Sequence, residues 1–60
     1  MGMTITSIDE GWEIYNSGTW YYILGNYDDG YEVYDDLNHM NRDLYSSKDF
    51  ESCLMWVYNS

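Results

Sequence analysis

The sequence has no proline, one cysteine and only two basic residues among its 60 residues. A single cysteine cannot form an internal disulfide, so the cross-links that stabilise many small domains are excluded. No apolar run approaches the roughly 20 residues of a membrane-spanning helix, and no basic start with an apolar middle marks a secretory signal. We therefore expect a cytoplasmic protein with a free thiol.

Basic residues are scarce and acidic residues are abundant. Eleven Asp and Glu against two Lys and Arg give a formal net charge of −9. Nucleic-acid affinity depends on basic side chains that neutralise phosphates, which argues against direct nucleic-acid binding. Anionic membrane surfaces are disfavoured for the same reason. The natural partner of such a chain is a protein with a basic surface.

Apolar and aromatic residues are present in amounts that indicate a folded chain. Hydrophobic residues make up 45% of the sequence and aromatic residues 20%, far from the composition of disordered segments. Residues 1–60 are long enough for one domain, with Met3 interpreted as the natural start and Met1-Gly2 as an expression remnant. Folding hides only about 60% of the unfolded surface of so short a chain. Self-association is the remaining source of stability, and we expect a homodimer.

The order of local patterns predicts a β-meander over about 12–34. Residues 12–15 alternate apolar and polar side chains, 20–24 are aromatic and β-branched, and 31–34 alternate again, as strands do. Turn residues separate the three segments. Residues 4–8 form either a leading strand or a docked arm, and residues 43–45 are a candidate short edge strand.

The C-terminal segment, about 47–58, has the pattern of a helix. Ser46 or Ser47 is the expected N-cap, and Phe50, Leu54 and Val57 recur at helical spacing with Cys53 beside them, which makes one apolar stripe. The predicted fold is α+β: a three- to four-stranded antiparallel β-meander with one C-terminal helix packed on one face.

A two-residue hairpin turn at Ser17-Gly18 would divide the meander into two unlike faces. The face for the helix then carries Trp12, Ile14, Tyr21, Ile23, Tyr31 and Val33, and the other carries Glu13, Tyr15, Trp20, Tyr22, Glu32 and Tyr34. A three-residue turn would instead exchange Trp20 and Tyr22 with Tyr21 and Ile23. Both registers leave several rings on the uncovered face.

These uncovered rings are the candidate contact surface. Aromatic residues and Met are enriched in protein interfaces, and large exposed apolar patches mark interaction sites. The helical projection also leaves Met55 and Trp56 without cover in the monomer. A competing interpretation is that the tyrosines lie flat on the sheet with their hydroxyls in water. The candidate residues for a partner or a dimer are Tyr15, Trp20, Tyr22, Tyr34 and Trp56.

Five carboxylates within nine residues form the second candidate contact. One interpretation is that they keep the chain soluble. The other is mimicry of nucleic acid, with an array of negative charges that competes for a basic cleft. A second acidic group consists of Asp9, Glu10 and Glu13. The candidate partner-binding carboxylates are Asp28, Asp29, Glu32, Asp35 and Asp36.

The sequence offers little for catalysis or for cofactors. His39 is the single histidine and stands in a polar segment, with no motif of a nucleophile and its base around it. Cys53 lies on the apolar helix stripe, where a small buried hydrophobe is expected. Scattered His, Cys and carboxylate residues lack a zinc spacing. We expect no enzyme, no metal site and no cofactor.

In size, charge and meander-plus-helix plan, the whole chain resembles the small acidic inhibitors that bacteriophages encode against host defences, such as anti-CRISPR and anti-restriction proteins. That resemblance is one of type and carries no residue motif. It implies stoichiometric binding to a host nuclease, helicase or effector. The alternative function is a self-associating structural or regulatory domain without an inhibitory role.

Overall fold

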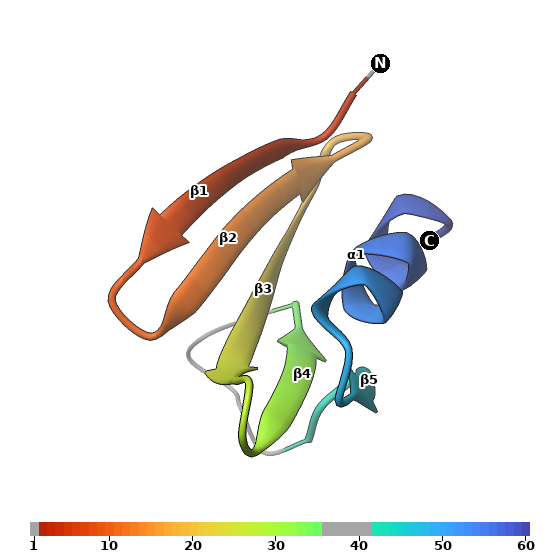
Figure 1. Cartoon of the computed structure of the whole chain (residues 1–60). Coiled ribbons are helices and arrows are strands. Elements are labelled where there is room, and N and C mark those ends of the chain that lie inside the picture. The colour runs from red at the N-terminus through yellow and green to blue at the C-terminus, as the bar shows by residue number, and fades with distance from the viewer. Residues whose placement is uncertain (1, 36–41) are drawn as a thin grey trace.

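The computed structural model describes residues 2–35 and 42–60. These residues form one antiparallel sheet of five strands, with a helix on one of its faces (Figure 1). The order of the strands in the sheet follows the order of the chain. The elements are β1 (Thr4–Ile8), β2 (Gly11–Asn16), β3 (Thr19–Asn26), β4 (Gly30–Tyr34), β5 (Tyr45–Ser47) and α1 (Phe50–Tyr58).

The predicted α+β class is confirmed, but the sheet has five strands instead of three or four. The segment that could have been a docked arm is β1, which pairs along its whole length with β2. The edge strand expected at 43–45 is β5, which runs from Tyr45 to Ser47 and pairs with β4. Both additions are edge strands. Their sequence patterns are weak, and they form stable strands only when a neighbouring strand supplies the hydrogen bonds.

The helix begins at Phe50, and neither Ser46 nor Ser47 is its N-cap. Both serines belong to β5, because their backbones pair with Glu32 and Tyr31 of β4. The N-cap residue is Asp49, whose carboxylate accepts a hydrogen bond from the Ser52 hydroxyl at 3.3 Å. The Asp49 backbone N–H donates to the Ser47 hydroxyl oxygen at 3.1 Å. Tertiary pairing of β5 thus shortens the helix that the sequence predicts.

The β2–β3 hairpin has a two-residue turn, the first of the two alternatives that the sequence left open. Ser17 and Gly18 both have positive φ, 53° and 83°, which suits the right-handed twist of a hairpin. The resulting register places Tyr15 opposite Trp20 and Ile14 opposite Tyr21. The predicted division of the sheet into two faces is therefore confirmed, and the three-residue alternative is wrong.

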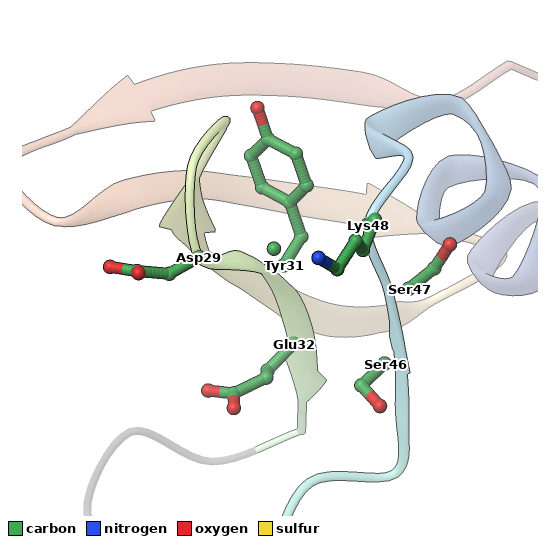
Figure 2. Close-up of a pocket in the computed structure, with 7 residues that line it drawn as sticks. Asp29, Tyr31, Glu32, Ser46, Ser47 and Lys48 are labelled. Atoms are coloured by element: carbon green, nitrogen blue, oxygen red, sulfur yellow. The ribbon is translucent and has the colours of Figure 1, made fainter.

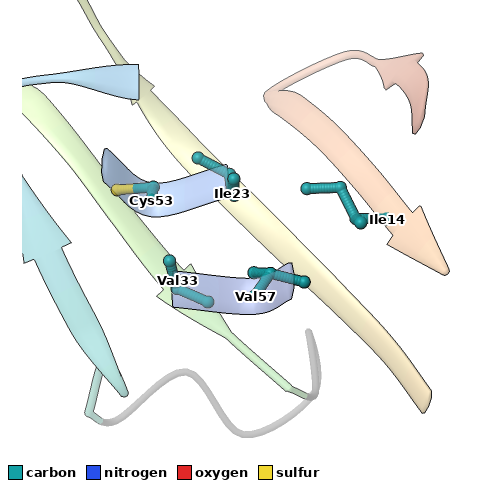
Figure 3. Packing of buried hydrophobic residues seen from close by; sticks show 5 residues of the cluster. All are labelled: Ile14, Ile23, Val33, Cys53 and Val57. Atoms are coloured by element: carbon teal, nitrogen blue, oxygen red, sulfur yellow. The ribbon is translucent and has the colours of Figure 1, made fainter. Parts of the chain in front are cut away.

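A small core lies between the helix and the sheet (Figure 3). Each of the three central strands contributes one fully buried side chain, and the helix contributes two. Phe50 and Leu54, which the predicted stripe also contained, are half-buried and pack around this cluster. The fully buried residues are Ile14, Ile23, Val33, Cys53 and Val57.

Aromatic rings complete the contact between helix and sheet. At one end, the Phe50 ring lies 4.6 Å from the Trp12 ring and 5.4 Å from the Tyr31 ring, centroid to centroid. At the other, Trp56 stacks on Tyr45 at 5.8 Å. Trp56 was expected to lack cover within the monomer, but it is half-buried in this packing. Its neighbour Met55 is 56% exposed, as expected.

A side chain from the sheet satisfies the end of the helix. The Asn16 amide donates to the Val57 carbonyl at 2.9 Å and to the Tyr58 carbonyl at 3.4 Å. Terminal helix carbonyls have no partner within the helix, and the last turn of α1 has no basic residue to compensate them. The Asn16 side chain is buried, with an exposed fraction of 6%. This contact fixes the C-terminus of α1 against the β2–β3 hairpin.

Replacing Asn16 with Ala should therefore lower the free energy of unfolding by about 0.5–1.5 kcal/mol, the contribution of a typical hydrogen bond. The Val57 carbonyl would keep only the Ser60 backbone N–H at 3.2 Å, and the Tyr58 carbonyl would lose the Asn16 amide. Urea unfolding followed by tryptophan fluorescence measures the change. Thr19→Ala is the matched control, since Thr19 is the exposed cross-strand partner of Asn16. An equal loss in the two variants would contradict the role of Asn16 at the helix end.

Burial raises the pKa of the Cys53 thiol above its ordinary value of 9.0, and the nearby Asp49 carboxylate adds to the shift. A raised folded-state pKa means that the folded chain prefers the protonated thiol. This contribution to stability is complete below the unfolded pKa and is lost as pH rises through the folded pKa.

We expect the free energy of unfolding to fall above pH 9, and Cys53→Ala to remove part of that fall. Urea unfolding of both proteins from about pH 7 to about pH 10 tests this, because the tyrosines that titrate in the same range are common to the two chains. Identical pH dependence in the two proteins would show that the thiol is not held in its neutral form.

Candidate protein-binding surface

Four aromatic side chains share the sheet face that points away from α1, which we call the open face. They come from β2, β3 and β4, at alternate positions of each strand. The cross-strand pairs are Tyr15 with Trp20 and Tyr22 with Tyr34. Trp20 and Tyr22 stand two residues apart on β3, so the two pairs join into one row. No described helix or strand covers this row, which we call the ring row.

The ring row is most exposed at its β2–β3 end. Trp20 is 47% exposed and Tyr15 38%, and their ring centroids lie 4.8 Å apart at a tilt of 53°. Tyr22 and Tyr34 are half-buried. A tilted aromatic pair is a rigid contact surface that already has its favoured geometry. It therefore needs little ordering when another molecule binds.

Carboxylates stand within the open face beside the rings. Glu13 lies opposite Tyr22, and Glu32 lies opposite Leu24. The Tyr34 hydroxyl donates a hydrogen bond to the Glu32 carboxylate at 2.9 Å. The pKa of Tyr34 is raised above its ordinary value. Burial is the largest cause, and this hydrogen bond is the next. Tyr34 thus remains a donor at neutral pH and orients the carboxylate.

The strand order brings together two acidic groups that are far apart in the sequence. Asp9 and Glu10 occupy the β1–β2 turn, and Asp28 and Asp29 occupy the β3–β4 turn. Alternate turns of a meander lie at the same end of the sheet, here with one strand-to-strand connection between them, and the β3–β4 turn extends two residues further along the strands than the β1–β2 turn. We call these four carboxylates the acidic end. The sequence analysis treated them as separate groups.

The other predicted carboxylates do not join this end. Asp35 follows β4 and lies at the opposite end of the strand, roughly 20 Å from Asp29 at the rise of extended chain. Glu32 lies between them on the open face. Asp36 lies outside the described residues. The run that looks like one cluster in the sequence is therefore spread along β4.

The β3–β4 turn holds its carboxylates in a defined geometry. The Asp29 backbone N–H donates to the Asn26 side-chain oxygen at 2.7 Å, and the Asn26 amide donates to the Asp29 carboxylate at 3.2 Å. Tyr27, at the tip of this turn, is 85% exposed. Sequence reasoning missed this ring, although its position between Asn26 and Asp28 is typical of a turn and could have indicated its exposure.

A shallow hollow of about 220 Å³ lies beside the acidic end, between β4 and β5 (Figure 2). Asp29 and Glu32 line it from β4 and its turn, and Lys48 lines it from the segment after β5. One of the two basic residues of the chain therefore stands next to the acidic end and offsets part of its charge. Sequence reasoning missed this neighbour because the β4–β5 pairing sets it.

Within residues 2–35 and 42–60, no group of three His, Cys, Asp or Glu side chains is placed to hold a metal ion. His39 lies outside this part of the chain. No helix in the described ranges is long and apolar enough to cross a membrane.

The chain was compared with protein-family models, with curated proteins and with solved structures, and it matches none of them.

Proposed function

We propose that the chain is a non-catalytic inhibitor that binds a protein through the open face of its sheet. Its target would be a bacterial nuclease, helicase or effector with a basic nucleic-acid-binding site, and occupation of that site would block it. This function agrees with what the resemblance to phage anti-defence proteins implies, and the chain would act in the host cytoplasm. The ring row Tyr15–Trp20–Tyr22–Tyr34 on an uncovered sheet face is the observation that carries the proposal.

The chemistry of the open face is complementary to arginine and lysine. Aromatic faces attract these cations by about 0.5–2 kcal/mol each, and carboxylates form charge-assisted hydrogen bonds with them. Glu13 and Glu32 stand among the rings, so one basic side chain can meet both kinds of group. A nucleic-acid-binding site offers such cations in quantity, together with positions that accept stacked bases.

The size of the open face favours a contact that also includes the acidic end. Five strands about 4.8 Å apart and about six residues long give a face of roughly 400 Å² in projection. A standard interface uses about 800 Å² of each partner. A partner that covers the ring row would therefore extend over neighbouring turns, and Asp9, Glu10, Asp28 and Asp29 lie at one border.

The net charge of −9 should raise the rate at which the chain associates with a basic partner. Opposite charges steer two proteins into encounter and raise the association rate at low salt, whereas the packed rings determine how long the complex lasts. Charge and rings therefore have separable kinetic effects. Variants of each can be told apart in the same binding assay.

Trp20→Ala should weaken the complex by roughly 30-fold or more, the loss typical of an interface hot spot of about 2 kcal/mol. The assay immobilises the chain, passes a bacterial lysate over it, and elutes retained proteins with duplex DNA. The dissociation rate of the retained protein is then measured for each variant. Urea unfolding of the same variants separates loss of binding from loss of folding.

Tyr58→Ala is the matched control for Trp20→Ala. Tyr58 is also an exposed ring, at 58%, but it lies on the helix, on the other side of the sheet. Equal weakening by both variants, or a Trp20→Ala effect explained by unfolding, would contradict the open face as the contact. Retained proteins that duplex DNA does not displace would contradict occupation of a nucleic-acid site.

Neutralising Asp28 and Asp29 to Asn should slow association at low salt by up to about tenfold and reduce its salt dependence. Asp49→Asn with Glu51→Gln is the matched control, because these residues lie at the start of α1 and both double variants change the net charge from −9 by the same two units. Stopped-flow mixing with the retained protein gives the rates. If both pairs slow association equally, only the total charge matters and the acidic end has no local role.

A further inference from the structure

The two edges of the sheet are protected to different extents. β5, at one edge, is three residues long and is flanked by Asp43 before it and by Lys48 and Asp49 after it. Short length and nearby charge are the usual means by which proteins prevent an edge from pairing with another strand. The β5 edge is therefore blunted.

The β1 edge has less of this protection: the strand is longer than β5, and charged residues flank only its C-terminal end, at Asp9 and Glu10. The strand Thr4–Ile8 has five residues, no charge and no proline, and its first four residues are exposed. β1 pairs with β2 on one side only, so its other side presents unpaired backbone N–H and C=O groups. Three of its residues are Thr or Ser and two are Ile, a composition that favours strand pairing.

From this asymmetry we propose that β1 is a self-association edge, and that its partner is β1 of a second copy of the chain. The two strands pair antiparallel about a two-fold axis at Thr6, the register that overlaps all five residues of each strand. Thr6 then faces Thr6 of the second copy, and Ile5 faces Ser7. This interface is separate from the open face and goes beyond the proposed inhibitory function.

The strand can pair with itself because, in the Thr6-centred register, all five uncharged residues of one copy face uncharged residues of the other. Charge indicates why a second copy would use this edge instead of another surface. Another copy also carries −9, so an approach through the open face or the acidic end brings carboxylates together. In the Thr6-centred register, the seam itself contains no charged residue. The turn with Asp9 and Glu10 of one copy lies beside the uncharged Gly2-Met3 of the other, so these turn carboxylates are at opposite ends of the seam. The nearest carboxylates to its centre belong to Glu13 of each copy, which lies opposite Thr6 on β2, one strand away from the seam.

Side chains on both faces gain contacts across this seam. Ile5 lies on the helix face beside Ile14 and is 46% exposed. In the proposed register it is diagonal to Ile5 of the second copy, within the reach of long side chains. On the open face, the two Thr6 side chains meet directly, and cross-strand Thr pairs stabilise antiparallel sheets. An isologous pair of this kind closes after two copies.

The predicted dimer is weak because the seam is short. Five paired residues bury far less than the roughly 1,000 Å² of total surface expected for a tight interface. Sedimentation equilibrium from about 10 μM to about 1 mM is the appropriate measurement for such an affinity. We expect the weight-average mass to rise with concentration from 7.2 kDa toward twice that value.

Thr6→Glu should raise the dissociation constant at least tenfold, because it places two carboxylates opposite each other in the seam, each beside Glu13 of its own copy. Ser46→Glu is the matched control: it makes the same change in net charge on β5, opposite Glu32 at the other edge of the sheet. Circular dichroism checks that both variants are folded. A wild-type mass of 7.2 kDa at all concentrations, or equal effects of the two variants, would overturn the proposal.

A disulfide trap tests the register independently of affinity. Thr6→Cys places two thiols at paired positions, where Cα atoms are about 4.5–5.5 Å apart, a separation that a disulfide can bridge. Under mild oxidation, we expect a covalent dimer on a non-reducing gel for Thr6→Cys and far less for Ser46→Cys. The native Cys53 thiol is buried and is common to both variants. Equal dimer yields would overturn the Thr6-centred register.

Discussion

One nine-residue helix packs on a sheet of five strands. Because the helix is smaller than the sheet, this mismatch determines which surfaces of the sheet stay uncovered. A helix with its side chains is about 10 Å wide, whereas five strands span about 19 Å. α1 therefore packs chiefly against β4 and β5, over the core residues of the central strands. The entire opposite face and the β1 side remain without a covering element among the described residues (Figure 1).

The chain compensates for so small a core with contacts that use polar and aromatic groups. Only five side chains among residues 2–35 and 42–60 are fully buried, but rings of Trp12, Tyr31 and Phe50 close one end of the helix–sheet interface. Asn16 closes the other end by bonding to two helix carbonyls. Rings supply large buried area with few rotatable bonds. They are therefore efficient where the number of residues is limited, and the same property makes them effective contacts on the open face.

Much of the sheet could be predicted from the sequence because its strands carry local signals. Alternation over 12–15 and the turn residues around Ser17-Gly18 predict the β2–β3 hairpin, but the sequence left two registers open, and the structure decides the faces of Trp20 and Tyr22. Features that depend on distant pairing could not be predicted. The helix start moves to Phe50 because β4 pairs with β5, Trp56 is covered because α1 lies over Tyr45, and the acidic end forms because two turns share one end of the meander.

The uncovered surfaces differ in chemistry, and this difference is why we propose different partners for them. The open face combines rings with Glu13 and Glu32 and suits a basic protein, whereas β1 is neutral and suits a strand without charge. Pairing at Thr6 keeps the side chains of paired residues on the same face, so two open faces would become one continuous surface with two ring rows. A basic cleft long enough to hold extended nucleic acid could then contact both rows at once. In such a complex even a weak β1 seam matters, because the second contact is intramolecular once the first has formed.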